Sequence, residues 1–228
     1  MSSTKSARKR SKVVQEHREP VASFNGMVPK NLAQQVYLEA IERSDVVFGI
    51  GSAGTGKTYV AASYAAEKLF YREIDKIIVT RPNVEASRGF GFLPGDLDEK
   101  YAPYLEPFES VFIRSFGKSL YDLFRKRGQI DPRPLGFMRG ATFDNAVVLV
   151  DECQNMTHKE FKLLLTRIGD NTKVIFSGDS RQVDIQDSGL LDTIDRLKYI
   201  PEIETIEFHP SDIVRSALCK QIILEYER

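Results

Sequence analysis

The stretch GIGSAGTGKTYV, residues Gly49–Val60, joins the apolar run DVVFG to the helix-like run VAASYAAEKLF. Within it, four residues separate Gly51 from the triplet Gly56–Thr58, which is the spacing of a P-loop. A P-loop lies between a strand and a helix, and the two flanking runs are of these kinds. The stretch therefore predicts a phosphate-binding loop rather than a glycine-rich turn that matches by chance.

The chemistry of such a loop follows from its residue types. Glycines let backbone N–H groups turn inward and approach phosphate oxygens, and the helix that begins near Lys57 adds its N-terminal dipole. Lys57 is expected to neutralise the β- and γ-phosphates of ATP, and the Thr58 hydroxyl is expected to ligate Mg²⁺. The residues predicted to bind the nucleotide are Gly51, Ser52, Ala53, Gly54, Thr55, Gly56, Lys57, Thr58 and Tyr59.

Short apolar runs predict the strands of a parallel sheet. The runs VVFGI, KIIVT, AVVLVD and TKVIFSGD are rich in valine and isoleucine and almost continuously apolar, as strands buried on both faces are. Longer helix-like segments, such as Tyr59–Phe70 and Thr157–Ile168, lie between them. Strands that alternate with helices indicate βαβ units, so we expect an α/β fold whose parallel sheet has helices on both faces.

The stretch NLAQQVYLEAIERS lies upstream of the P-loop and predicts a helix. It begins with Asn31, which is a typical N-cap residue. The apolar residues Leu32, Val36 and Ile41 then recur at roughly helical spacing. We therefore expect a helix directly before the first strand.

Two other stretches depart from the alternation of strands and helices. Residues 1–30 are polar and mostly basic, which predicts a disordered tail, although an arm that contacts nucleic acid is compatible with the same composition. Residues 88–140 contain many aromatic residues and several prolines, so we expect an insertion with helices of its own that packs on the sheet. A single domain is expected to span residues 31–228, with this insertion inside it.

The composition fits a globular protein of the cytoplasm. The chain has 228 residues, of which 42% are hydrophobic and 28% charged, and this is enough for a sizeable core. Its formal net charge of zero gives no sign of strong attraction to nucleic acid by the whole molecule, but leaves a local patch open. Two cysteines argue against a disulfide framework. No run is long enough for a membrane span, and the N-terminus lacks the apolar region of a signal peptide.

Two further motifs point to nucleotide hydrolysis. In VVLVDECQN, Asp151 ends an apolar strand, where a carboxylate is unfavourable unless it meets a cation, so it is expected to hold Mg²⁺ through water. Glu152 is expected to polarise an attacking water. In VIFSGDSRQVD, another apolar strand ends at Gly178 and Asp179, and Gln182 is predicted to reach the γ-phosphate region. The alternatives are an acidic turn and a loop without a catalytic task.

In this order, the chain contains the stretches GSAGTGKT, IIVTRPNVEA, GFLPGDLDEKYAPYLEPF, FMRGATFDNAVVLVDECQNMT, LLLTRIGDNTKVIFSGDSRQVD and DIVRSALCKQIILEYE. Over about residues 31–225 the chain thereby resembles the PhoH family of P-loop ATPases, which is also found in bacteriophages. The resemblance implies a RecA-like core similar to one motor domain of superfamily 1 helicases. The chain departs from the family pattern at Ser52, where proline is usual, and at Ala141, where a second arginine is frequent.

The resemblance also implies roles for residues outside the P-loop. Gln34 corresponds to a glutamine that reads the adenine edge, and Arg81 lies where such ATPases engage nucleic acid or couple it to the nucleotide. Arg167 and Arg215 lie in family motifs and are candidate arginine fingers, with Arg139 as an alternative finger from the insertion. An ordinary helix glutamine and plain intramolecular ion pairs are the alternatives for these positions.

The expected function is Mg²⁺-dependent ATP hydrolysis by direct attack of water, coupled to RNA or single-stranded DNA. A nucleotide-switched assembly factor without nucleic-acid activity is the main alternative, and a kinase is the third. Because the chain contains one P-loop and has too few residues for a second RecA-like domain, we expect a neighbouring subunit to supply the arginine. A head-to-tail contact of this kind closes into a ring, for which we expect a hexamer with ATP at the subunit interfaces.

Overall fold

The computed structural model describes residues 23–82 and 97–226. Three segments, 1–22, 83–96 and 227–228, lie outside the described residues. Most of the predicted tail, the motifs NVEA and GFLPGD and the first residues of the predicted insertion therefore lie outside them as well.

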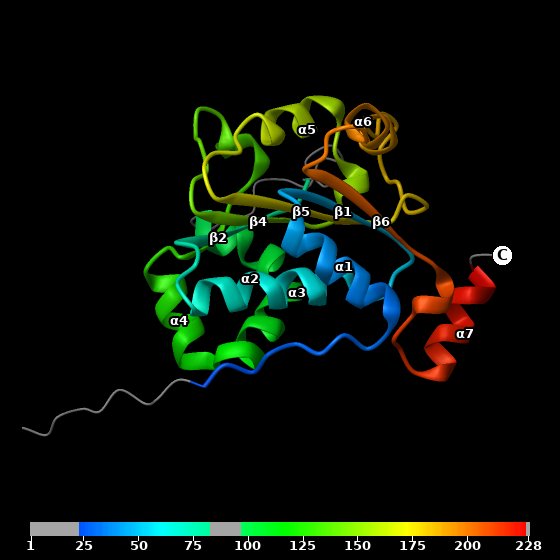
Figure 1. The fold of residues 1–228 in the computed structure, drawn as a ribbon, viewed down its shortest axis with the longest axis horizontal. Coiled ribbons are helices and arrows are strands. Elements are labelled where there is room, and N and C mark those ends of the chain that lie inside the picture. The colour runs from blue at the N-terminus through cyan, green and yellow to red at the C-terminus, as the bar shows by residue number, and fades with distance from the viewer. Residues whose placement is uncertain (1–22, 83–96, 227–228) are drawn as a thin grey trace, which may run out of the picture.

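The described residues form a sheet of six parallel strands in the order β3-β2-β4-β5-β1-β6 (Figure 1). The strands are β1 (Val46–Gly51), β2 (Lys76–Thr80), β3 (Ile130–Pro132), β4 (Ala146–Val150), β5 (Thr172–Gly178) and β6 (Ile203–Phe208). The four apolar runs correspond to the central strands β1, β2, β4 and β5, and this prediction is confirmed. The edge strands escaped prediction, because IDP contains a proline and IETIEF alternates apolar residues with charged ones.

Helices cover both faces of the sheet (Figure 1). One face carries α1 (Leu32–Arg43), α2 (Lys57–Phe70), α3 (Leu97–Phe116) and α4 (Lys118–Lys126). The other face carries α5 (His158–Leu165) and α6 (Leu190–Leu197), while α7 (Ala217–Tyr226) lies to one side. Successive residues of a strand point to opposite faces, so Val47 belongs to the core with α2 and Phe48 to the core with α5. The predicted α/β architecture is confirmed.

Helix α1 is present where the sequence predicts it, but its buried face differs from the one that the apolar residues mark. The Asn31 side chain accepts a hydrogen bond from the Gln34 backbone N–H at 2.9 Å, as an N-cap does. Leu32 and Val36 are 72% and 37% exposed. The buried residues of α1 are Gln34, Tyr37, Ala40 and Ile41. The spacing of the apolar residues predicted the wrong buried face, because a glutamine rather than an apolar residue turns toward the P-loop.

The inserted segment is mostly helical, as expected. Helix α3 packs along α2, and the Phe112 ring stacks on Phe116 with a centroid distance of 6.1 Å. After α4, Ile130–Pro132 returns to the sheet as β3 and pairs with β2, which the sequence did not reveal. The insertion therefore supplies a sheet edge as well as a helix beside the P-loop. None of the helices in the described part of the chain has the length and apolar character that a membrane span needs.

Candidate functional site

The P-loop lies at the carboxyl edge of the sheet, between β1 and α2. Its backbone enters the left-handed region at Gly51, with φ +139°, and at Gly56, with φ +91°. A Cβ atom on Gly51 would lie 2.0 Å from the Phe208 carbonyl oxygen, and one on Gly56 would lie 2.5 Å from Gln34 Nε2. Both positions therefore need glycine for backbone conformation and for space.

Lys57 is folded into the loop that it closes. Its Nζ donates hydrogen bonds to the carbonyl oxygens of Gly51 and Ser52 at 2.6 and 2.8 Å, and to Thr55 Oγ1 at 3.3 Å. Burial lowers the pKa of Lys57, and the negative charge of Asp179 opposes this effect. Since burial disfavours the charged ammonium group, an anion that reached Nζ would be bound favourably.

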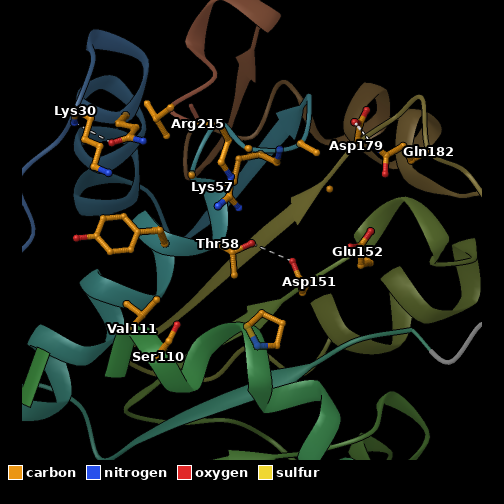
Figure 2. A pocket seen from close by; sticks show the side chains of 18 of the residues that line it. Lys30, Lys57, Thr58, Ser110, Val111, Asp151, Glu152, Asp179, Gln182 and Arg215 are labelled. Atoms are coloured by element: carbon orange, nitrogen blue, oxygen red, sulfur yellow. Dashed lines mark hydrogen bonds between the residues drawn. The ribbon is translucent and has the colours of Figure 1, made fainter. Parts of the chain in front are cut away.

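Thr58 and Asp151 meet at the start of α2 and the end of β4. Thr58 Oγ1 donates to Asp151 Oδ1 at 3.2 Å (Figure 2). Burial raises the pKa of Asp151, Glu152 adds to the increase, and Arg81 opposes it. Among the described residues, no three His, Cys, Asp or Glu side chains cluster as a metal site would require. One carboxylate and one hydroxyl nevertheless suit Mg²⁺, which keeps several waters and binds phosphate oxygens.

Glu152 has an unusual backbone conformation for its residue type. Its φ of +53° lies in the left-handed region, which costs an L-residue about 1–2 kcal/mol. Its two carboxylate oxygens face different partners: Oε2 accepts from Gln154 Nε2 at 2.6 Å, and Oε1 lies 3.8 Å from Arg81 Nη2. The side chain is 35% exposed, so water reaches a carboxylate held at this turn.

The loop after β5 brings two polar side chains to the same cavity. Gln182 Nε2 donates to Asp179 Oδ2 at 3.0 Å, and Asp179 is buried (Figure 2). Both residues line a cavity of about 550 Å³ together with Thr58 and Glu152. The structure thus gathers the predicted hydrolytic residues around one space.

The opposite end of this cavity is lined by Gln34, Tyr59 and a face of α3. Gln34 is fully buried; its Nε2 donates to the Thr55 carbonyl oxygen at 2.8 Å, and its Oε1 accepts from the Lys30 N–H at 2.9 Å. The amide therefore contacts the P-loop backbone directly. The α3 residues of the cavity wall, which the sequence did not identify, are Pro107, Ser110, Val111 and Arg114.

The candidate arginines lie in different places. Arg81 and Arg215 line the cavity, and Arg215 contacts its own chain's P-loop, since a Cβ on Gly54 would lie 2.9 Å from Arg215 Cγ. Arg167 lies at the amino edge of the sheet, where its carbonyl oxygen accepts from the Phe143 N–H at 2.9 Å just before β4 begins. The P-loop occupies the other edge, so the structure brings Arg215 to the site and leaves Arg167 remote from it.

Comparisons with known proteins agree with this architecture. Protein PhoH of Escherichia coli (strain K12) is 43% identical over 205 residues, which are 88% of this chain and 58% of that protein. The PhoH-like protein of Bacillus subtilis (strain 168) is 44% identical over 202 residues, which are 87% of this chain and 63% of that protein. This chain therefore spans less than two thirds of the length of either relative.

A solved structure shares the fold at low identity. The large terminase of a thermophilic bacteriophage aligns with a TM-score of 0.51 and 15% identity, over 88% of this chain and 50% of that chain. At that identity the likeness concerns the fold alone. The family model described as PhoH-like protein matches residues 26–227. Because that match covers nearly the whole sequence, the chain belongs to the PhoH family.

Proposed function

We propose that this chain binds ATP with Mg²⁺ and hydrolyses it by direct attack of water on the γ-phosphate. One observation carries the proposal: two segments far apart in the chain, Lys57–Thr58 at the start of α2 and Asp151–Glu152 directly after β4, converge on one cavity at the carboxyl edge of the sheet. Ligands of open parallel sheets bind at this edge. A volume of about 550 Å³ lies within the usual range for small-molecule sites.

Each residue has a distinct task in this reaction. Lys57 Nζ exchanges the Gly51 and Ser52 carbonyl oxygens for phosphate oxygens. Thr58 Oγ1 and the Asp151 carboxylate would hold Mg²⁺, which supplies charge neutralisation at the phosphates when bound. The Glu152 carboxylate orients the attacking water. As the water oxygen bonds to the γ-phosphorus, the bond from this phosphorus to the oxygen that bridges it to the β-phosphate breaks. The products are ADP and inorganic phosphate, and the phosphate carries the two protons of the water.

Turnover and binding measured on paired variants test this division of tasks. Glu152→Gln should retain ATP binding and lose turnover, because the amide keeps the shape but polarises water poorly. Asp151→Asn should weaken the Mg²⁺-dependent part of binding instead. Glu67→Gln, an exposed change on α2, serves as the control and should match the parent protein. Identical binding defects in the first two variants would contradict the assignment.

We further propose that hydrolysis is coupled to RNA or single-stranded DNA through Arg81. This residue supports the coupling because its side chain is 40% exposed at the cavity and its Nη2 lies 3.8 Å from Glu152 Oε1. A phosphodiester that binds Arg81 would weaken its hold on Glu152. The test measures the rate of ATP turnover with and without single-stranded RNA or DNA. A rate that neither nucleic acid changes would favour a nucleotide-switched assembly factor.

We also propose a homo-oligomeric ring with head-to-tail contacts. The position of Arg167 supports it, because this residue lies at the edge of the sheet away from its own P-loop, so a nucleotide that it contacts would belong to a neighbour. Its Nε is buried without a hydrogen-bond partner inside the described part of the chain, so the side chain would have to move to act as a finger. Arg215, by contrast, lies beside its own chain's P-loop, so we propose that it acts on its own chain's nucleotide. Light scattering with ATP and Mg²⁺ tests the assembly, since a monomer at full activity would exclude the ring.

A further inference from the structure

Gln154 lies at the centre of a hydrogen-bond network that joins the end of β4 to the loop after β5. The residue is 1% exposed. Nε2 donates to Glu152 Oε2 at 2.6 Å and to the Gln182 carbonyl oxygen at 3.2 Å, while Oε1 accepts from the Asp179 N–H at 3.0 Å. All three partners belong to the residues that face the proposed γ-phosphate position.

The surroundings of Gln154 leave its amide little freedom. A Cβ on Gly178 would lie 2.7 Å from Gln154 Oε1, so the end of β5 approaches this closely only because it ends in glycine. Ser188 Oγ donates to the Gln154 carbonyl oxygen at 2.7 Å. The amide is therefore fixed by contacts on its side chain and on its backbone, which is what a positioning residue requires.

The neighbouring Asn155 provides a useful contrast. Its Nδ2 donates to Asp184 Oδ2 at 3.1 Å, and its Oδ1 accepts from the Asp184 N–H at 2.8 Å. Asn155 thus fastens the same loop with the same chemistry, and neither of these bonds reaches Glu152. Of the two amides, Gln154 alone joins the loop to the carboxylate.

We propose that Gln154 is a positioning residue for hydrolysis, which holds the Glu152 carboxylate in register with the loop that carries Asp179 and Gln182. The inference rests on the proposed function, because it assigns Glu152 the orientation of water. Arg81, whose Nη2 lies 3.8 Å from Glu152 Oε1, is the other charged partner of this carboxylate. If the amide of Gln154 is removed, we expect the Glu152 side chain to turn toward Arg81. A displaced carboxylate would slow the chemical step and leave nucleotide binding unchanged.

The test compares Gln154→Met with Asn155→Leu, since each removes a buried amide of similar shape that fastens the loop. We expect Gln154→Met to lower kcat about 10- to 100-fold with little change in KM or in ADP affinity, because a misplaced group costs up to about that factor. Asn155→Leu should lower thermal stability and leave kcat within about threefold, since the carboxylate keeps its partner. Equal losses of kcat in the two variants would overturn the inference.

Two additional variants keep the inference decidable. Gln154→Glu retains the acceptor for the Asp179 N–H, but its carboxylate cannot donate to Glu152, so its kcat should also fall. This variant provides the test if Gln154→Met does not fold. In a Glu152→Gln background, adding Gln154→Met should not lower the residual single-turnover rate further. If Gln154→Met lowered the rate in the Glu152→Gln background by as large a factor as in the parent protein, the inference would be overturned. Absence of turnover in the parent protein would overturn the proposed function as well, whereas normal turnover in Gln154→Glu would overturn this inference alone.

Discussion

Replacing Gln34 by methionine separates two roles for this glutamine. The side chain is fully buried, and methionine preserves its approximate volume while removing both hydrogen bonds. The Thr55 carbonyl oxygen loses its bond from Nε2 in a buried setting, which costs about 1–3 kcal/mol. The Lys30 N–H is only partly buried and loses a bond worth about 0.5–1.5 kcal/mol. We therefore expect the free energy of unfolding to fall by about 1.5–4.5 kcal/mol, which a typical domain survives.

The functional result depends on what the amide contacts. If it holds the P-loop, as its bond to Thr55 indicates, the affinities for ATP and for GTP should fall by the same factor. Since about 1.4 kcal/mol corresponds to tenfold, a loss of about 2 kcal/mol transmitted to the loop predicts a decrease of up to about 30-fold. Calorimetric titration with each nucleotide in Mg²⁺ measures both affinities, and urea unfolding measures the stability.

Gln35→Met provides the matched control on the same helix. Gln35 is exposed, and its bond to Glu39 at 3.0 Å is of a kind worth about 0.2–0.5 kcal/mol, so nucleotide affinity should not change. A loss of ATP affinity in Gln34→Met with GTP affinity unchanged would refute the role in the P-loop and favour the reading of the adenine edge. Unchanged affinity for both nucleotides would refute both roles.

Three further predictions concern the charged groups of the site. Lys57→Ala should retain its circular dichroism spectrum but lose ATP turnover and the thermal stabilisation by nucleotide. Asp151→Asn should melt above the parent protein at neutral pH without nucleotide, because burial raises the pKa of Asp151 and its ionised form therefore destabilises the fold. Lowering the pH through that pKa protonates the parent carboxyl group, so the difference in melting temperature should shrink in acid. In mixtures with Lys57→Ala, Arg167→Ala should regain turnover and Arg215→Ala should not, since Arg215 lies on its own P-loop.

Much of the fold and of the candidate site could be predicted because both depend on short local patterns. Central strands of a parallel sheet are buried on both faces, so β1, β2, β4 and β5 appear as apolar runs. Their carboxyl ends meet at one edge, which places Asp151 near the P-loop without any further information. The edge strands β3 and β6 have one open side and carry no such signal.

The residues that escaped prediction make contacts between distant parts of the chain. Gln154 is one of them: its side chain donates to the carbonyl oxygen of Gln182, a predicted site residue 28 positions away, and no periodicity in the sequence marks this bond. The α3 residues of the cavity wall escaped prediction for the same reason, because packing of α3 along α2, which is distant in the chain, brings them to the cavity. The spacing of the apolar residues on α1 predicted the wrong buried face, because Leu32 and Val36 are exposed while Gln34 is buried.

The shape of the P-loop is set by two segments that its motif does not contain. Gln34 supports it from the upstream helix through Thr55, and on the other side the Val214 N–H donates to the Gly54 carbonyl oxygen at 3.0 Å. These segments are also joined to each other, since Asn31 Nδ2 donates to the Asp212 carbonyl oxygen at 2.9 Å. The loop is therefore held from both sides before any phosphate binds, so less ordering remains for the nucleotide to impose. The motif specifies the chemistry of the ligand, whereas the geometry that receives it depends on residues 180 positions apart in the chain, from Gln34 to Val214.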